Sequence, residues 1–193
     1  MDRKTMQTRM FATRMKARAE PDESEMILEA DFAVFGKETE LWKGAFEEIA
    51  PGAFAKTLSD DIRALINHDT TLVLGRTKAG TLVLEETDKV LRGMIYINPS
   101  DTDAVNLYER VKRGDIDQCS FGFDILDEET EWRDDGTVKW TIKEVKLYEV
   151  SPVTFPAYED TAVQARSKEV EKRKKEILEQ RKNNLKERIK KWH

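Results

Sequence analysis

The sequence predicts an α+β fold that is mostly antiparallel β-structure, arranged as a β-barrel with flanking helices. Three observations lead to this prediction: short apolar runs with period-two alternation, close spacing between these runs, and only two or three stretches with helical periodicity. A chain of 193 residues with 39% hydrophobic residues suits one globular domain with charged ends. We therefore expect a single core built mainly from hairpins.

The predicted strands follow one another closely along the chain. The first core strand is expected in the run 26–36, where Leu28, Ala30, Phe32 and Val34 share one face. A Pro-Gly turn at 51–52 is expected to lead into a short helix that ends near Leu58. Turn residues at 134–136 (Asp-Asp-Gly) favour an antiparallel hairpin. The remaining strands are predicted at 62–66, 71–76, 81–84, 90–97, 118–126, 137–142 and 145–150.

One internal helix is predicted at residues 101–113. Its start is indicated by Ser100 or Asp101 as N-cap and its end by Gly114. Apolar residues recur at helical spacing along it, at Val105, Leu107, Tyr108 and Val111.

Charge divides the chain into three parts. Residues 1–18 hold six Lys or Arg against one Asp, and residues 166–193 hold twelve against five acidic residues, so an acidic body lies between two basic ends. We expect a mobile basic arm with an acidic linker at 1–25, the folded domain at 26–165, and a charged helical tail at 166–193. The tail has a narrow apolar stripe near seven-residue spacing, so it would stay partly disordered, self-associate or dock on a partner.

The composition restricts the chemistry. The single Cys119 excludes an intramolecular disulfide, and no apolar run has the length of a membrane span, which favours a reducing cytosolic compartment. We expect no metal and no cofactor, because a zinc site needs three or four His, Cys or carboxylate ligands. A carboxylate-only Mg²⁺ or Ca²⁺ site among the acids at 115–129 stays open, although their spacing is typical of a solvated face.

Histidine is scarce, and this draws attention to His68. His193 ends the charged tail, so His68 is the one histidine that a folded core can use. It follows the apolar run 64–66, which predicts a buried strand that would hold its ring rigidly. The alternative is a structural Asn-His-Asp turn in which Asp69 caps a backbone amide.

Ser120 lies on a predicted apolar strand in the sequence Cys-Ser-Phe-Gly-Phe. Alternation places Ser120, Gly122 and Asp124 on one face of this strand. Cys119 and the two phenylalanines then lie on the other face. A serine together with one internal histidine suggests a nucleophile and its base. The alternative is a serine that fills a tight position under a loop.

Five segments follow one another along the chain: 46–54, 67–69 with 74–76, 80–82, 119–123, and 145–157. In their order and spacing they resemble the prohead proteases of tailed phages, serine peptidases related in fold to the herpesvirus assemblins. The resemblance covers residues 26–162, most of the chain. It implies a herpesvirus-protease-like barrel in which Ser120 is the nucleophile, His68 the base and an acidic residue near Glu149 the third member. Assemblins use a second histidine as third member, and the core of this chain has none.

A carboxylate that binds the second ring nitrogen of the histidine fixes its tautomer and stabilises the imidazolium. Glu149 is our first choice for this role and Asp124, on the face of Ser120, the second. An outward-facing strand carboxylate is the other interpretation of Glu149. Candidates for the oxyanion donors are Arg76 and the backbone amides about Phe121 and Gly122.

The resemblance implies a serine endopeptidase that cleaves scaffold and capsid-protein segments inside the precursor shell, with self-cleavage. Its partners would be the major capsid protein and scaffold segments, and possibly a second copy, with no membrane and no required nucleic acid. It would act in the host cytoplasm inside the assembling procapsid. One alternative is a catalytically silent β-barrel assembly or scaffolding module. A second makes Cys119 the nucleophile, against which alternation argues, because Cys119 and Ser120 cannot both face His68.

Overall fold

The structure is a computed structural model and describes residues 7–11, 15–19, 25–155 and 161–190. The chain divides into two compact units, residues 1–157 and 158–193. The first unit holds all the strands and the helix α1 (Thr102–Arg113), and the second holds the 30-residue helix α2 (Thr161–Lys190). The fold is therefore α+β with mostly antiparallel strands, as predicted.

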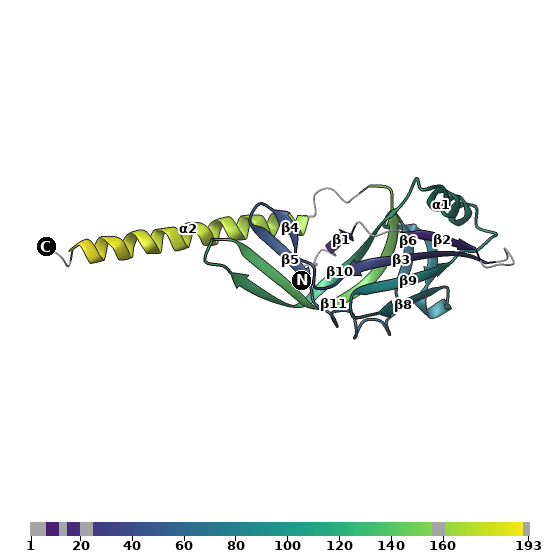
Figure 1. Cartoon of the computed structure of the whole chain (residues 1–193), viewed down its shortest axis with the longest axis horizontal. Helices are drawn as coiled ribbons and strands as arrows, with labels where there is room; N and C mark the ends of the chain where they lie inside the picture. Colours follow the sequence, from purple (N-terminus) through teal and green to yellow (C-terminus); the bar gives the residue numbers. More distant parts are fainter. Residues whose placement is uncertain (1–6, 12–14, 20–24, 156–160, 191–193) are drawn as a thin grey trace. The chain divides into compact units, whose positions relative to one another are not determined.

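The larger sheet is built around two long strands that form a hairpin (Figure 1). Its turn is the predicted one, closed by a hydrogen bond from the Arg133 amide to the Thr137 carbonyl. Two short strands, β6 (Arg63–Ile66) and β7 (Asp69–Arg76), join the sheet at the end of the second long strand. The main order across the sheet is β1 (Gln7–Phe11), β10 (Gln118–Trp132), β11 (Val138–Val153), β5 (Ala45–Ile49) and β4 (Thr39–Trp42).

Strand β11 corrects one sequence prediction. It is one continuous strand where two were expected, at 137–142 and 145–150. Its edge away from β10 pairs in parallel with β5 near its start and with β6 near its end, so the mostly antiparallel sheet contains two parallel pairings. These pairings place the β6–β7 hairpin beside the end of β11.

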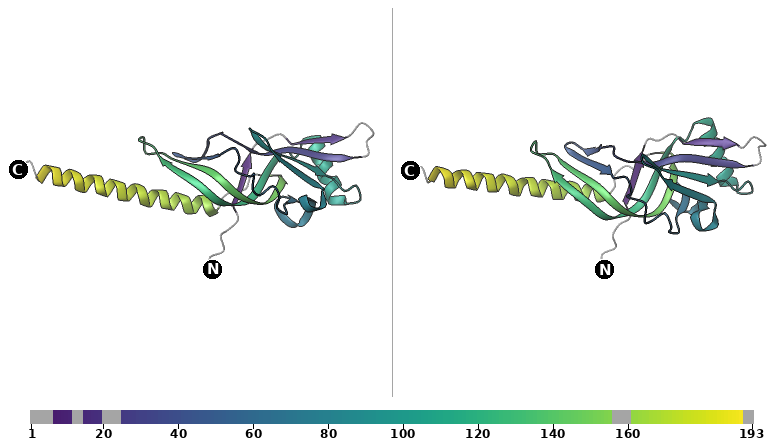
Figure 2. Two further views of the ribbon diagram at one scale, coloured as in Figure 1. Left: turned by 90° about the horizontal axis from the view of Figure 1, so that it is seen from below. Right: turned by 60° about the horizontal axis from the view of Figure 1, so that its bottom comes forward.

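The smaller sheet is fully antiparallel and has the order β2 (Lys16–Ala19), β3 (Met26–Val34), β9 (Val90–Tyr96) and β8 (Leu82–Glu86) (Figure 2). Between β7 and β8 lies the 3₁₀ turn η1 (Thr77–Ala79). Gly93 on β9 permits close packing, because a Cβ there would lie 2.5 Å from the Phe32 ring. Helix α1 packs against β2 and β3. The Asp101 side chain accepts hydrogen bonds from two amides at its start and Gly114 ends it with φ 89°, as the sequence predicted.

The core lies between the sheets and is rich in aromatic side chains. Phe121 and Phe123 on β10 stack with ring centroids 4.9 Å apart, and Phe54 meets Phe121 edge-on at 5.5 Å. All three rings are fully buried. These contacts hold one face of β10 in the core, so the position of its other face is fixed as well.

Two sequence predictions on the fold differ from the structure, and a third, the barrel, is not confirmed. The expected mobile arm instead forms strands β1 and β2 over its described residues. The segment after Pro51 forms successive turns, since it bonds to β11 through Ala53 and Thr57 and does not continue as a helix. The described strands form two open sheets and no closed barrel, because β10 and β11 belong to a sheet separate from that of β3 and β9.

Candidate active site

His68 is presented by a tight turn. Asn67 and His68 have φ of 50° and 62°, and the residues that flank them, Ile66 and Asp69, are paired across β6 and β7. Positive φ at both central positions is the geometry of a type I′ hairpin, in which glycine is usual at the second position. A side chain in this region costs on the order of 1–2 kcal/mol per residue. A histidine at such a position makes its ring a candidate for a functional role.

Neighbouring strands hold this turn in place. The Asn67 amide donates to the Pro152 carbonyl at 3.0 Å, and the Thr154 amide donates to Asn67 Oδ1 at 2.8 Å. The end of β11 thus fixes the loop backbone. The ring position follows from the sheet and not from the short hairpin alone.

The His68 ring binds Glu149. Its Nδ1 lies 2.7 Å from Glu149 Oε1, and the Glu149 side chain is only 4% exposed. Ser151 Oγ donates to the other carboxylate oxygen at 2.5 Å and accepts a hydrogen bond from the His68 amide at 3.2 Å. A buried carboxylate with two such partners can orient an imidazole and fix its tautomer.

Ser120 lies on the same face of the sheet. It pairs across the strands with Ser151, and Gly122 pairs with Glu149, so these four residues share a face. Ser120 is fully buried, and its Oγ donates to the Arg9 carbonyl on β1 at 3.0 Å. His68 Nε2 is also buried and, within the described part of the chain, has no hydrogen-bond partner. The structure thus joins His68 to Glu149 and places Ser120 on the face of the sheet that holds Glu149, with the Ser120 hydroxyl bonded to Arg9 and not to His68.

Asp124, the second choice for the third member, lies in another contact. It accepts a hydrogen bond from the Tyr148 hydroxyl at 2.9 Å. Burial, together with this bond, raises the pKa of Tyr148 above its ordinary value. The structure therefore places Glu149, and not Asp124, on the His68 ring.

Ser151 is a site residue that the sequence interpretation did not single out. The signal was available, because Glu149 and Ser151 are two apart on a strand and therefore share a face. What the sequence lacked was the register that places Ser151 opposite Ser120.

Cys119 and Arg76 have partners other than the His68 ring. Cys119 is fully buried, and its Sγ contacts the Asp31 carbonyl at 3.4 Å. Arg76 is at the end of the β6–β7 hairpin opposite the turn and is ion-paired with Asp61, which raises the pKa of Arg76 and lowers that of Asp61. The Phe121 side chain is in the core, and Gly122 lies next to Ser120 on β10.

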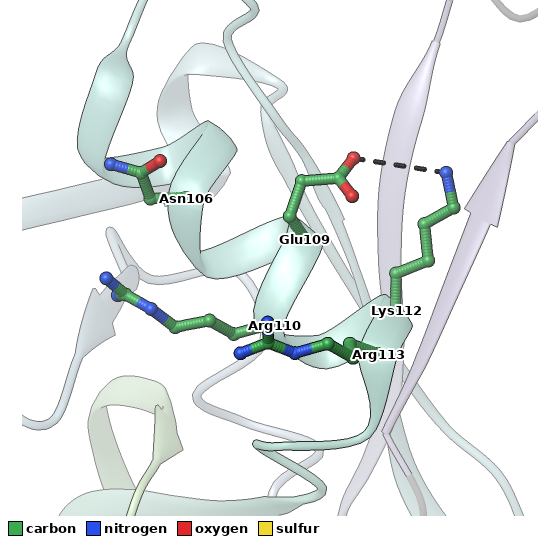
Figure 3. A pocket seen from close by; sticks show the side chains of 5 residues that line it. All are labelled: Asn106, Glu109, Arg110, Lys112 and Arg113. Carbon is green, nitrogen blue, oxygen red and sulfur yellow. Dashed lines mark ion pairs between the residues drawn. The ribbon is translucent and has the colours of Figure 1, made fainter.

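The described residues contain no group of three or more His, Cys, Asp or Glu side chains that could hold a metal ion. Neither of the two described helices is long and apolar enough to cross a membrane. A surface pocket on α1 is lined by polar and charged side chains from residues 106–113, with an ion pair between Glu109 and Lys112 (Figure 3). It contains none of the candidate site residues.

Comparison with known proteins identifies the family of the chain. No curated protein and no solved structure matches the chain. A family model described as Caudovirus prohead serine protease matches residues 13–176 of the 193. The matched range includes Ser120, His68 and Glu149, and it covers most of the chain. The chain therefore belongs to the Caudovirus prohead serine protease family.

Proposed function

We propose that this protein is a serine endopeptidase in which Ser120, His68 and Glu149 act together on scaffold and capsid-protein segments. Family membership makes it a serine peptidase, a hydrolase of peptide bonds that serves phage capsid maturation. The observation that carries the residue assignment is the 2.7 Å contact between His68 Nδ1 and the buried Glu149, on the face that also holds Ser120. The fold relationship to herpesvirus proteases belongs to the same proposal.

The proposed hydrolysis has two stages, acylation of Ser120 and hydrolysis of the acyl ester. Ser120 Oγ attacks the substrate carbonyl carbon while its proton passes to His68 Nε2, and the carbonyl oxygen becomes an oxyanion. Collapse of this intermediate breaks the C–N bond, and the proton goes from His68 to the leaving amine. Water then attacks the acyl ester, with His68 again as base, to release the acid and restore the serine. Glu149 holds the imidazole through Nδ1 and remains ionised.

Ser151 is a positioning residue in this proposal. Its hydroxyl donates a hydrogen bond to Glu149 and accepts one from the His68 amide. Ser151 thus links the carboxylate to the turn that carries His68. The assembling prohead is the proposed place of action, with major capsid protein and scaffold segments as partners. Self-cleavage and a dimer belong to the proposal as well.

The test compares two neighbouring residues. Ser120→Ala is expected to abolish cleavage of capsid and scaffold polypeptide, whereas Cys119→Ala keeps most of it, as followed by gel electrophoresis and mass spectrometry. Activity that survives in Ser120→Ala and disappears when Cys119→Ala is added would identify Cys119 as the nucleophile, and a thiol reagent would then inhibit the wild type. A wild type that cleaves no capsid or scaffold polypeptide, yet is needed for shell assembly, would favour the silent assembly module.

A further inference from the structure

Strand β1 covers the candidate nucleophile. Its five residues pair in antiparallel register with residues 119–123 of β10, and Met10 lies directly opposite Ser120. This edge of β10 is the one that β11 does not occupy. An extended peptide that binds beside Ser120 would need the same edge, because an added strand uses the backbone groups that β1 now pairs. β1 therefore lies where a substrate would bind.

The contact between Ser120 and β1 is unproductive for catalysis. A serine hydroxyl has one proton, and Ser120 donates it to the Arg9 carbonyl at 3.0 Å. That proton is not shared with an imidazole, and the buried His68 Nε2 has no partner within the described residues. With Ser120 fully buried, neither substrate nor water reaches its Oγ in this arrangement.

Arg9 anchors β1 through a buried ion pair. Its Nε and one terminal nitrogen donate to the two carboxylate oxygens of Glu47 on β5, at 2.5 Å and 2.9 Å. The two residues are 8% and 5% exposed, and the guanidinium lies over the Phe123 ring at 5.7 Å from its centroid. A bidentate pair out of water is specific for arginine, since lysine cannot reproduce its planar fork.

We propose that β1 is an internal competitor on the substrate strand of the enzyme, and that Glu47 is the specificity residue that selects an arginine at the position of Arg9. The inference rests on the proposed function and adds its substrate class: an extended basic peptide with arginine one residue before the position opposite Ser120. β1 precedes residues 13–176, so it lies outside the part of the chain that matches the family. The enzyme is latent until β1 leaves the edge of β10.

The latency is tested in the full chain by the rate at which a fluorophosphonate probe labels Ser120. Arg9→Ala is expected to raise this rate by at least about tenfold, equivalent to about 1.4 kcal/mol of weakened β1 binding. Because Arg9→Ala leaves Glu47 buried without that guanidinium, the double variant Arg9→Ala/Glu47→Gln removes both charges and guards against misfolding. Arg18→Ala is the matched control, since Arg18 forms an exposed pair with Glu29 on the neighbouring strands.

The specificity is tested by adding peptide back. A synthetic peptide with the sequence of residues 5–13 is expected to slow labelling of Arg9→Ala, and the same peptide with alanine for arginine should bind about tenfold more weakly or worse. In Arg9→Ala/Glu47→Gln the two peptides should inhibit equally, because the carboxylate that distinguishes them is gone. Thermal melting followed by circular dichroism establishes that each variant is folded.

The outcomes separate the two proposals. Equal labelling of the wild type and the folded double variant, with peptide cleavage intact, overturns the role of β1 and leaves the protease standing. An arginine peptide that inhibits Arg9→Ala no better than its alanine form overturns the role of Glu47. If Ser120 is labelled in no folded variant and no peptide is cleaved, the proposed function fails and this inference fails with it.

Discussion

At the scale of single residues, His68 combines an unfavourable backbone conformation with a favourable side-chain contact. Its φ of 62° disfavours any residue with a Cβ, while its ring binds Glu149. A glycine at position 68 would avoid the steric cost of this backbone conformation. Such a conflict between stability and local geometry is typical of functional sites.

This conflict predicts a difference between two inactive variants. His68→Gly and His68→Ala both remove the base and should both abolish hydrolysis. His68→Gly should nevertheless be the more stable of the two by about 1 kcal/mol, because only glycine enters the left-handed region without steric cost. Urea unfolding of both proteins measures this difference. Equal midpoints, or a more stable alanine variant, would show that the turn is not strained.

Glu149 predicts a loss of rate without a loss of fold. Glu149→Gln keeps the shape of the side chain but cannot hold the imidazole in the same tautomer, so turnover should fall on the order of 10⁴-fold. Asp124→Asn should keep most activity, since Asp124 contacts Tyr148 instead of His68. Steady-state kinetics on both variants, with melting curves, checks this. The reverse pattern would assign the third role to Asp124.

At the scale of elements, ion pairs tie the end of the β10–β11 hairpin to β4 and β5. Arg133 in the turn donates to both oxygens of Glu38, and Lys139 on β11 lies 2.8 Å from Glu48 on β5. The hydrogen bond from Arg133 holds the pKa of Glu38 below its ordinary value of 4.5. The hydrogen bond that Lys139 donates to Glu48 raises the pKa of Lys139. These ion pairs hold the hairpin end against its neighbours, at the end of the sheet that is distant from His68.

The Glu38 shift predicts a pH-dependent contribution to stability. A carboxylate whose pKa is lowered on folding stabilises the protein above its ordinary pKa, and this contribution is lost as the pH falls through the lowered value. Arg133→Met should therefore lower the melting temperature by a few degrees at most at pH 7, because a solvent-screened ion pair contributes little. The cost should shrink as the pH falls below the ordinary value of 4.5.

Lys182→Met is the control for this experiment. Lys182 pairs with Glu179 three residues earlier on α2, so it joins no separate elements. Its substitution should change the melting temperature less than that of Arg133. A cost of Arg133→Met that stays constant from pH 7 into the acid range would show that the pair with Glu38 is not its source.

At the scale of the whole molecule, the charged ends act in different ways. The N-terminal end supplies β1 and β2 to the two sheets, whereas residues 158–193 form a unit of their own. The tail at 166–193 has an excess of basic residues, twelve against five acidic ones. Such a segment favours electrostatic docking that salt screens over about 8–10 Å.

Deletion of residues 167–193 is expected to leave a folded enzyme that still cleaves a small peptide. It should enter assembling shells poorly, because the tail contributes localisation and not chemistry. Kinetics on the peptide and quantification of the protease in purified proheads measure the two effects. A second deletion, of 177–193, keeps every residue that matches the family. Loss of peptide cleavage in a cooperatively melting protein would show that the helix completes the site or a required dimer.

Sequence patterns alone predicted much of the local structure, and they singled out Ser120 and His68 as candidate catalytic residues, which stays a prediction. The cap and stop of α1, the hairpin turn at 134–136 and most strands follow from short-range periodicity and turn chemistry. Ser120 and His68 stand out because their residue types are rare in such positions, and the order of five segments identified the family.

Only the tertiary structure decided how distant strands meet. Periodicity shows which residues share a face, but it does not show which strand lies alongside or in which register. The contact of His68 with Glu149 spans 81 positions, and that of Ser120 with Arg9 spans 111, so neither follows from local pattern. The choice of Glu149 over Asp124, the parallel pairing of β11 and the place of β1 over Ser120 all depend on these long-range hydrogen bonds. They are satisfied only when the whole sheet has formed.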